Sequence, residues 1–322
     1  MRQYLVRRLI QTIPVLLLIT ILVFAITINA PGSPVSKMLD PNMTPEEKAR
    51  IESKFGLDKS IPEQYLDWIS EVLLKGNLGY STKFAQPVTN VMQDHMWNTF
   101  QLALFSLFIS LFIGIPTGII SATRQYSKVD YVLTVFALLG ISIPSFFFGL
   151  LLIKFLAIDL GWFPMYGRVN PDMANASNFR QFLDIMWHMI LPGIVLGLGA
   201  TAGFMRYTRA TMLEVIRQDY IRTARSKGLK EKVVIYKHAL RNGLIPVITL
   251  LGFRIPLLFS GALITEQIFK WPGMGSIGIS AILDRDYPLL MGVNLFLAFL
   301  TLMGNLMADI FYGFADPRIK YD

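Results

Sequence analysis

Side chains that perform enzyme chemistry are few in this sequence and do not converge. The three histidines, His95, His188 and His238, lie in different segments, and no metal-site spacing such as His-Glu-x-x-His connects them. The pattern Gly-x-Ser-x-Gly does not occur, so serine hydrolysis has no support. Because the chain contains no cysteine, thiol chemistry is excluded. The reactive residues therefore predict neither a catalytic site nor a metal site.

Two glycine patterns bear on nucleotide binding. Gly273, Gly275 and Gly278 satisfy Gly-x-Gly-x-x-Gly, but the run follows Trp271-Pro272 with no preceding strand, which favours a turn over a dinucleotide fold. A Walker A phosphate loop requires a Gly-Lys dipeptide, and the sequence has none. We expect no cofactor on this chain, so any ATP hydrolysis takes place on another polypeptide.

Three charged residues in or beside apolar stretches are candidates for lining or gating a pathway: Arg254, Glu266 and Asp286. An ionisable side chain within a membrane costs free energy unless it is paired or faces a polar cavity, so it is a functional candidate. Arg254 either lines a pathway or pairs with a carboxylate, or it extends toward the inner membrane surface, and the sequence does not decide among these alternatives. We find no row of acidic residues that would predict a proton relay.

The elements that must position these residues are membrane helices. Of the 322 residues, 53% are hydrophobic and 16% are charged, whereas soluble domains average about 25% charged residues. A spanning helix needs about 20 mostly apolar residues, and six windows qualify: 9–29, 99–122, 131–157, 188–205, 244–268 and 288–313. The sequence therefore predicts an all-α membrane protein with six transmembrane helices.

Lys and Arg are distributed unequally between the two sides that six crossings create. The side with both termini, 123–130 and 206–243 has 17 basic and 6 acidic residues, and the other side has 11 basic and 14 acidic residues. Because basic residues concentrate in cytoplasmic loops, both termini are predicted to be cytoplasmic. The net charge of +8 follows from this asymmetry and does not predict a nucleic-acid partner. A cleaved signal peptide is the alternative for 9–29, but its apolar run exceeds the usual length of about 7–15 residues.

The segment 31–98 has helix signals of its own. Thr44-Pro45-Glu46-Glu47 places a capping Thr, a Pro at the first helical position and a Glu three residues after the cap. Apolar residues then recur at helical spacing from Ile61 through Tyr65 and Trp68 until Gly76. We expect a small helical region outside the membrane. The alternative is a pair of helices on the lipid surface, with Tyr65 and Trp68 among the headgroups.

The segment 206–243, here called the basic hairpin, has ten Lys and Arg residues. Its first part is helical in pattern, Gly228 breaks the helix, and 230–241 reads as a second short helix ending at Asn242-Gly243. A basic loop that only touches anionic lipid needs no such layout. The pattern therefore favours a shaped surface for a protein partner.

Residues 214–246 resemble the loop that membrane subunits of ATP-binding-cassette (ABC) importers share. Arg222-Thr223-Ala224 stands where the general motif has Glu-Ala-Ala, Gly228 matches its glycine, and His238-x-Leu240-Arg241 replaces Ile-x-Leu-Pro. Arg at the first position departs from the general motif but agrees with the dipeptide, oligopeptide and nickel branch. Further stretches typical of that branch are Arg7-Arg8-Leu9, Pro31-Gly32-Ser33-Pro34, Gly76-Asn77-Leu78-Gly79, Pro87-Val88, Ile143-Pro144-Ser145-Phe146, Glu266–Gly273, Arg285-Asp286-Tyr287-Pro288 and Asp316-Pro317-Arg318. Phe253-Arg254-Ile255-Pro256 departs from it, because small or apolar residues are expected there.

The resemblance implies a fold, a location and a set of partners. The fold is a type I ABC importer (MetI-like) permease in a prokaryotic inner (plasma) membrane. It consists of a first helix with an extracytoplasmic helical loop (1–98), a transmembrane core (99–313) and a cytoplasmic tail (314–322). The partners are a second permease subunit, two cytoplasmic ATPases that bind ATP and Mg²⁺, an extracytoplasmic solute-binding protein and membrane lipid.

The resemblance also implies a role for the basic hairpin, which docks on an ATPase. The coupling residues are Arg222, Thr223, Ala224, Lys227, Gly228, His238, Leu240, Arg241 and Asn242. The expected cargo is a di- or oligopeptide. The alternatives are nickel or another small solute, or a carrier that needs no ATPase.

Overall fold

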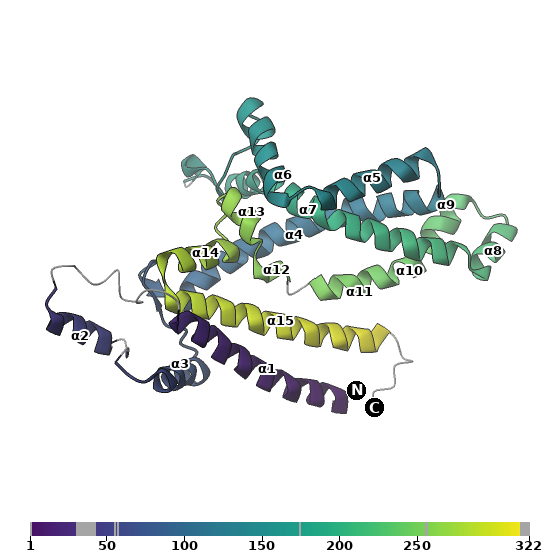
Figure 1. The fold of residues 1–322 in the computed structure, drawn as a ribbon. Coiled ribbons are helices and arrows are strands. Elements are labelled where there is room, and N and C mark those ends of the chain that lie inside the picture. The colour runs from purple at the N-terminus through teal and green to yellow at the C-terminus, as the bar shows by residue number, and fades with distance from the viewer. Residues whose placement is uncertain are drawn as a thin grey trace.

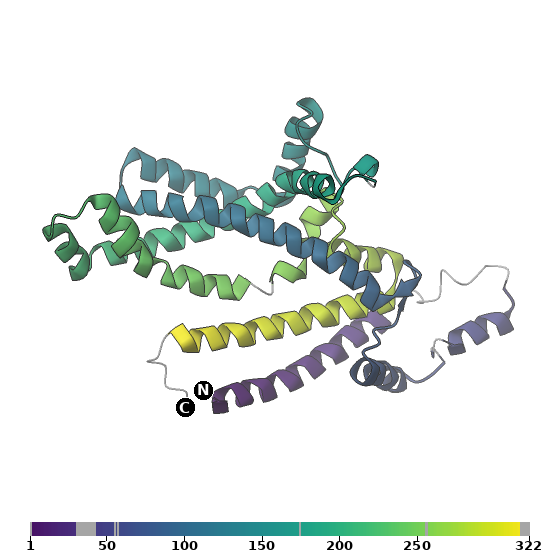
Figure 2. The ribbon, with the colours of Figure 1, turned by 180° about the vertical axis from the view of Figure 1, so that it is seen from behind.

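The computed structural model describes residues 2–29, 43–54, 56, 58–173, 175–254 and 257–315, and these are mostly helical. The four longest helices are α1 (Arg2–Ile28), α4 (Val88–Thr123), α7 (Asn178–Ile216) and α15 (Tyr287–Ala315). They lie roughly lengthwise beside one another, with α1 against α15 and α4 against α7 (Figures 1 and 2). Each overlaps one of the predicted windows and extends beyond it at one end or both. These four windows are therefore correctly predicted as helices at the right positions in the chain.

Helices α4 and α7 pack closely because glycines line their contact. A Cβ atom at Gly118 of α4 would lie 2.7 Å from the Cβ of Thr208, and one at Gly197 of α7 would lie 2.8 Å from Ile109 Cγ2. Residues with higher numbers on α4 face residues with higher numbers on α7, so the two helices run in the same direction. Small residues at helix contacts are common in membranes, where association depends on close van der Waals packing.

The third predicted window is bent. Helix α5 (Lys128–Ser142) is followed by α6 (Ser145–Leu152) and a π-helical segment η1 (Ile153–Asp159), and the two halves make an angle of 101°. Ile143, just before Pro144, has extended backbone angles, because a residue before proline is disfavoured in the α conformation. Window 131–157 is therefore two helical arms and not one straight span.

The fifth predicted window, 244–268, is broken into three short helices. These are α11 (Ile245–Arg254), α12 (Leu257–Ser260) and α13 (Leu263–Ile268). Gly261 has a φ of +83°, and a Cβ there would lie 2.5 Å from the backbone nitrogen of Gly275. Helix α14 (Met274–Asp284) follows. By length and composition, four helices of the described chain can cross a membrane, or five if the bent pair counts as one span.

The segment after α1 forms the two helices that its sequence predicts. Helix α2 (Pro45–Lys54) begins with the expected box, in which Thr44 N donates to Glu47 Oε2 (2.9 Å) and Glu47 N donates to Thr44 Oγ1 (3.3 Å). Helix α3 (Ile61–Lys75) ends at Gly76 in the left-handed conformation. The strands β1 (Tyr80–Ser81) and β2 (Gln86–Pro87) pair antiparallel before α4. A short 3₁₀ turn, η2 (Pro171–Met173), precedes α7.

Helix α3 is held against α1 by an aromatic cluster. The Phe24 ring stacks on Trp68 at 5.9 Å and meets Tyr65 edge-on at 5.5 Å, and the Tyr65 hydroxyl is 2.9 Å from Thr20 Oγ1. Tyr65 and Trp68 are half-buried. They therefore pack on α1, and the choice between a helical region outside the membrane and helices on the lipid surface stays a prediction.

Candidate functional site

The basic hairpin (206–243) begins in the last turns of α7 and continues beyond the end of that helix. Beyond α7 it consists of α8 (Asp219–Ser226), α9 (Glu231–Val233), a π-helical turn η3 (Val234–Ala239) and α10 (Leu240–Gly243). Gly228, between α8 and α9, has a φ of +73°, a conformation that favours glycine. The predicted glycine bend and second helix are therefore present. The break between Ile216 and Asp219 is an additional feature that the sequence analysis missed.

An apolar cluster fixes the hairpin to the ends of α4 and α7. Its buried members come from α4, α7, α8 and the second arm of the hairpin: Ile119, Ala122, Met212, Ile221, Ala224, Val234, Ile235 and Ala239. Figure 1 shows α8 and α9 beside the ends of α4 and α7. Movement of the hairpin must therefore be transmitted to these long helices through side-chain packing.

Polar contacts close the hairpin on itself. Arg225 donates to Glu231 from Nη2 (2.7 Å) and Nε (3.2 Å), across the bend at Gly228. This contact lowers the pKa of Glu231 and raises that of Arg225. Asn242 Nδ2 donates to the Tyr220 hydroxyl (2.8 Å), which joins the last turn to α8. The two arms therefore have a defined relative position.

The predicted coupling residues divide into an exposed set and a packed set. Arg222 projects outward with a side chain that is 80% exposed, close to Asp219 (3.6 Å). The exposed set contains Arg222, Thr223, Lys227, Gly228, Arg241 and Asn242, and the packed set contains Ala224, His238 and Leu240. Ala224 packs inside the hairpin, so its small size serves internal packing. A Cβ at Gly228 would meet no atom within 4 Å, so glycine is favoured there by its positive φ and not by lack of space.

A buried ion pair that the sequence analysis missed lies between α5 and α7. Arg209 on α7 donates to Asp130 on α5 from Nε (3.1 Å) and Nη2 (3.0 Å). The carboxylate also accepts hydrogen bonds from Ser121 Oγ and the Tyr126 backbone nitrogen. Asp130 is only 4% exposed. The sequence does contain a signal for the position of Asp130 at the start of α5, namely the capping residue Ser127 three positions earlier, and Asp130 N donates to Ser127 Oγ (3.3 Å).

Glu266 is a fully buried hub where α13, α4 and α14 meet. Its carboxylate accepts hydrogen bonds from Thr99 Oγ1 (2.9 Å), Ala262 N (3.2 Å) and Ser276 N (3.0 Å). The residue also lines a cavity of about 170 Å³, together with residues of α4, α7 and α12. A buried carboxylate with three donors is stabilised in place, so Glu266 both faces a cavity and fixes its wall.

The Gly-x-Gly-x-x-Gly run packs against this hub. A Cβ at Gly273 would lie 2.5 Å from the Glu266 carboxylate, and one at Gly275 would lie 2.7 Å from Leu263 Cα. Trp271, just before the run, is fully buried, and its indole nitrogen donates to the Asn98 carbonyl (3.0 Å). These glycines therefore permit close packing of a turn, as the sequence context favoured.

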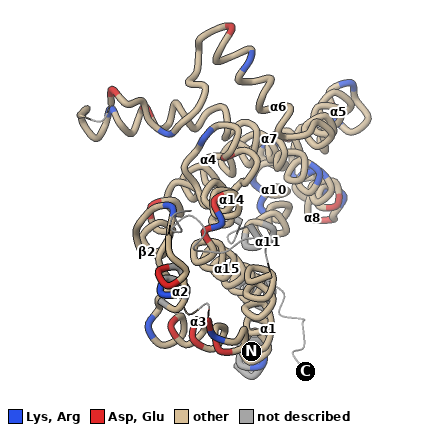
Figure 3. Tube along the Cα trace, turned by 60° about the vertical axis from the view of Figure 1, so that its left-hand side comes forward, with Lys and Arg blue, Asp and Glu red and all other residues tan. Residues whose placement is uncertain are grey.

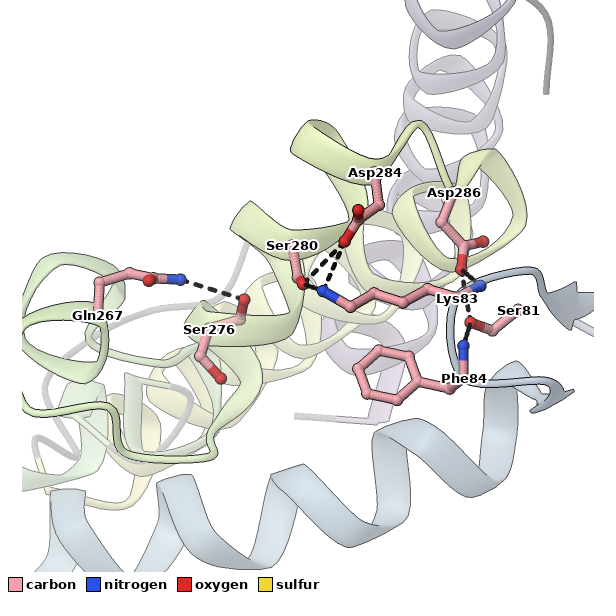
Figure 4. Close-up of polar contacts among 8 residues, drawn as sticks. All are labelled: Ser81, Lys83, Phe84, Gln267, Ser276, Ser280, Asp284 and Asp286. Atoms are coloured by element: carbon pink, nitrogen blue, oxygen red, sulfur yellow. Dashed lines mark hydrogen bonds and ion pairs between the residues drawn. The ribbon is translucent and has the colours of Figure 1, made fainter. Parts of the chain in front are cut away.

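Asp286 belongs to a different network, at the start of α15. Its carboxylate accepts hydrogen bonds from Ser81 Oγ (2.5 Å), the backbone nitrogen of Lys83 (3.0 Å) and Leu289 N (3.3 Å). Figure 4 shows Ser81 and Lys83 beside Asp286, with the Lys83 ammonium group reaching Ser280 and Asp284 on α14. Asp286 thus caps α15 and ties the β1–β2 turn to it.

The structure places two of the three charged candidates, Glu266 and Asp286, in separate networks. Glu266 bonds to α4 and α14, whereas Asp286 bonds to the β1–β2 turn. Arg254 is the last residue of α11, and its side chain lies outside the described part of the structure, as do Ile255-Pro256, Pro31–Pro34 and Asp316–Arg318. Within the described ranges, no group of three or more His, Asp or Glu side chains is arranged to hold a metal ion.

Two family models match the chain. Residues 114–321 match the binding-protein-dependent transport system inner membrane component, and residues 1–103 match the N-terminal part of such membrane components. The chain belongs to this family of inner-membrane transport components. Several described helices are long and apolar enough to span a membrane, so it is a multi-pass membrane protein, as its composition predicts.

Curated relatives match over full length. The oligopeptide transport system permease protein AppB of Bacillus subtilis (strain 168) is 44% identical over 322 residues, covering 100% of both chains. The dipeptide transport system permease protein DppB of Escherichia coli (strain K12) is 38% identical over 338 residues, covering 100% of this chain and 99% of the relative. The predicted resemblance to this permease branch is therefore confirmed.

The fold also matches a solved structure. An inward-facing structure of the MetNI methionine ABC transporter contains a chain with a TM-score of 0.55 and 16% identity, and the match covers 71% of this chain and 97% of that chain. This likeness shows the fold, a MetI-like helical arrangement. Figure 3 shows charged residues at α2–α3 and at α8, and further ones at α14 and on the arm that extends past α6.

Proposed function

We propose that this chain is the permease subunit of an ABC importer and forms half of the translocation pathway for di- and oligopeptides. Full-length relatives named as oligopeptide and dipeptide permeases support the peptide cargo. The observation that carries the coupling role is the basic hairpin, a packed helical projection with exposed cations at the end of α4 and α7. ATP and Mg²⁺ bind to partner subunits, and this chain has no cofactor and no catalytic role.

The proposed topology has six crossings with both termini in the cytoplasm. Helix α1 begins and α15 ends on the side of the molecule where the hairpin lies (Figures 1 and 2), which agrees with the excess of basic residues there. The bent α5–α6 pair and the broken α11–α13 segment supply the two further crossings. The units are 1–98, 99–313 and the tail 314–322.

The proposed partners are supported by the family to which the chain belongs. A second, homologous permease subunit completes the pathway, two cytoplasmic ATPases bind the hairpins, and an extracytoplasmic solute-binding protein delivers the cargo. Closure of the ATPases moves the hairpin, and the apolar cluster transmits this movement to α4 and α7. Alternating access then takes place by rigid-body motion of the two halves.

The pathway residues are proposed from burial and cavity position. Glu266 lines the cavity beside α4, and Arg254 lies at the end of α11, so both are candidates for the pathway wall. Asp286 is proposed to act as a gate element only through the β1–β2 turn that it holds.

The test combines co-purification with transport. A tagged chain extracted in detergent is expected to bring two ATPases and a second permease, and reconstituted complexes are expected to take up di- to octapeptides. Recovery of the chain alone would contradict the proposal. Uptake of nickel without peptide competition would support the nickel alternative.

A charge reversal examines the hairpin. Arg222→Glu changes an 80% exposed cation whose ion pair with Asp219 (3.6 Å) is also exposed, and an exposed pair contributes less than about 1 kcal/mol. Folding is therefore expected to remain intact while substrate-stimulated ATP hydrolysis falls. Arg124→Glu is the matched control, because Arg124 is also exposed on the hairpin side but lies in the α4–α5 turn. Equal loss in both variants would contradict a specific role for the hairpin.

A further inference from the structure

A groove of about 670 Å³ runs between α5 and α7, and the transport mechanism proposed above does not use it. Most of its wall is apolar, with Ala137, Leu138 and Ile141 from α5 facing Ala202 and Met205 from α7. From Ala202 to Ala210 the groove follows α7 for about 12 Å, given a rise of about 1.5 Å per residue. Such a channel has the shape and chemistry for part of an acyl chain.

The end of the groove nearest α8 is cationic. Arg206 and Arg209 lie there, with Tyr207 between them in sequence. The Arg209 guanidinium is already bonded to Asp130. Arg206 is exposed, and no acidic residue in the described part of the chain forms an ion pair with it. A cation is therefore available at the point where an apolar groove reaches the membrane surface.

We propose that the α5–α7 groove is a binding site for an anionic phospholipid of the cytoplasmic leaflet. One acyl chain lies along the apolar wall, and Arg206 binds the phosphate. The inference uses the orientation proposed above but does not depend on the cargo or the partners. Charge complementarity supports a lipid, because the cytoplasmic leaflet is rich in anionic headgroups. A second permease subunit in this groove would bury Arg206 and would have to supply a carboxylate for it.

The headgroup contact is tested on the purified full chain by native mass spectrometry. The chain is titrated with dioleoyl-phosphatidylglycerol or dioleoyl-phosphatidylcholine, and retained lipid is counted. We expect preferential retention of phosphatidylglycerol, reduced about fivefold by Arg206→Gln, since one basic residue near the surface contributes about 1 kcal/mol. Arg217→Gln is the control, because Arg217 is exposed near the end of α7 but does not line the groove. Equal retention of both lipids, or no effect of Arg206→Gln, would overturn the proposal.

The acyl-chain contact has an independent test. Gly203 lines the groove, and a Cβ there meets no atom within 4 Å. Gly203→Leu therefore adds an apolar side chain at the groove wall, and Gly203→Ala is the matched control that adds only a methyl group. We expect Gly203→Leu to lower retention of phosphatidylglycerol and Gly203→Ala to leave it nearly unchanged. Retention that is the same in both variants would contradict an acyl chain at this place.

Cross-linking tests whether a second permease subunit, and not a lipid, occupies the groove. Because the chain has no cysteine, Ala210→Cys introduces a single thiol in the groove wall. In the complex purified from membranes, we expect this thiol to cross-link to a phospholipid with a thiol-reactive headgroup. Cross-linking to a second permease subunit, without labelling by the lipid, would overturn the lipid assignment.

Discussion

The Thr99 hydroxyl on α4 donates a buried hydrogen bond of 2.9 Å to the Glu266 carboxylate on α13, which joins residues 167 positions apart in the chain. The same hydroxyl accepts a hydrogen bond of 2.7 Å from the backbone nitrogen of Met274, the first residue of α14. One side chain therefore fixes the relative position of three helices beside the small cavity that Glu266 lines.

Two substitutions of Glu266 should destabilise the fold to different degrees, according to how many hydrogen-bond acceptors they remove. Glu266→Gln replaces an acceptor oxygen by an NH₂ group facing buried donors, at an expected cost of about 1–3 kcal/mol. Glu266→Ala leaves three donors without an acceptor and should cost more. The apparent melting temperature of the purified chain, measured in one detergent, checks this order. Wild-type melting in Glu266→Ala would show that the hub does not stabilise the fold.

Two glycines on different helices predict opposite effects of one methyl group. Gly275→Ala places a Cβ 2.7 Å from the backbone of Leu263, which cannot move independently, so we expect destabilisation of about 1–3 kcal/mol. Gly203→Ala meets nothing within 4 Å in the middle of α7, so it should be neutral or stabilising by up to about 1 kcal/mol. Thermal unfolding of both variants is the measurement. A similar melting temperature for the two would contradict the close packing of α13 on α14.

Local signals in the sequence were sufficient for the features that depend on neighbouring residues. The Thr44–Glu47 box, the helix from Ile61 to Lys75 and the bend at Gly228 are all set by residues a few positions apart, and the structure confirms them. Four of the six windows are single long helices for the same reason, because apolar length alone predicts them.

Features that depend on distant residues could not be predicted. Pro144 explains the extended backbone at Ile143, but the 101° angle between the two halves also depends on how α6 packs against α7 and α13. The sequence predicts Glu266 only as a charged candidate for lining or gating a pathway, because its partner Thr99 is 167 positions away. The Asp130–Arg209 pair could not be predicted, because Arg209 is one of ten cations in 206–243 and nothing in the sequence indicates which of them faces Asp130.

The Arg225–Glu231 contact predicts a rescue by charge exchange. Arg225→Glu should loosen the bend at Gly228 and lower substrate-stimulated ATP hydrolysis, whereas global stability should change by less than about 1 kcal/mol because the pair is exposed. The double variant Arg225→Glu/Glu231→Arg restores the pair and should recover the activity. Because the contact holds the pKa of Glu231 below its ordinary value of 4.5, the comparison is made at neutral pH, where both groups are charged. Failure of the double variant to recover would indicate that Arg225 itself contacts the ATPase.

Asp286 predicts a local unfolding event at the start of α15. Asp286→Ala removes the helix cap, worth about 0.5–2 kcal/mol, and leaves the buried Ser81 hydroxyl and the Lys83 amide without their acceptor. We expect faster amide hydrogen exchange in 80–87 and in the first turn of α15, with unchanged exchange in the basic hairpin. Asp284→Ala is the control, because that neighbouring carboxylate pairs with the partly exposed Lys83 ammonium group, and an ion pair of this kind contributes less than about 1 kcal/mol. Equal exchange in the two variants would show that the buried carboxylate does not hold the β1–β2 turn, and a role of that turn in gating would then have no structural basis.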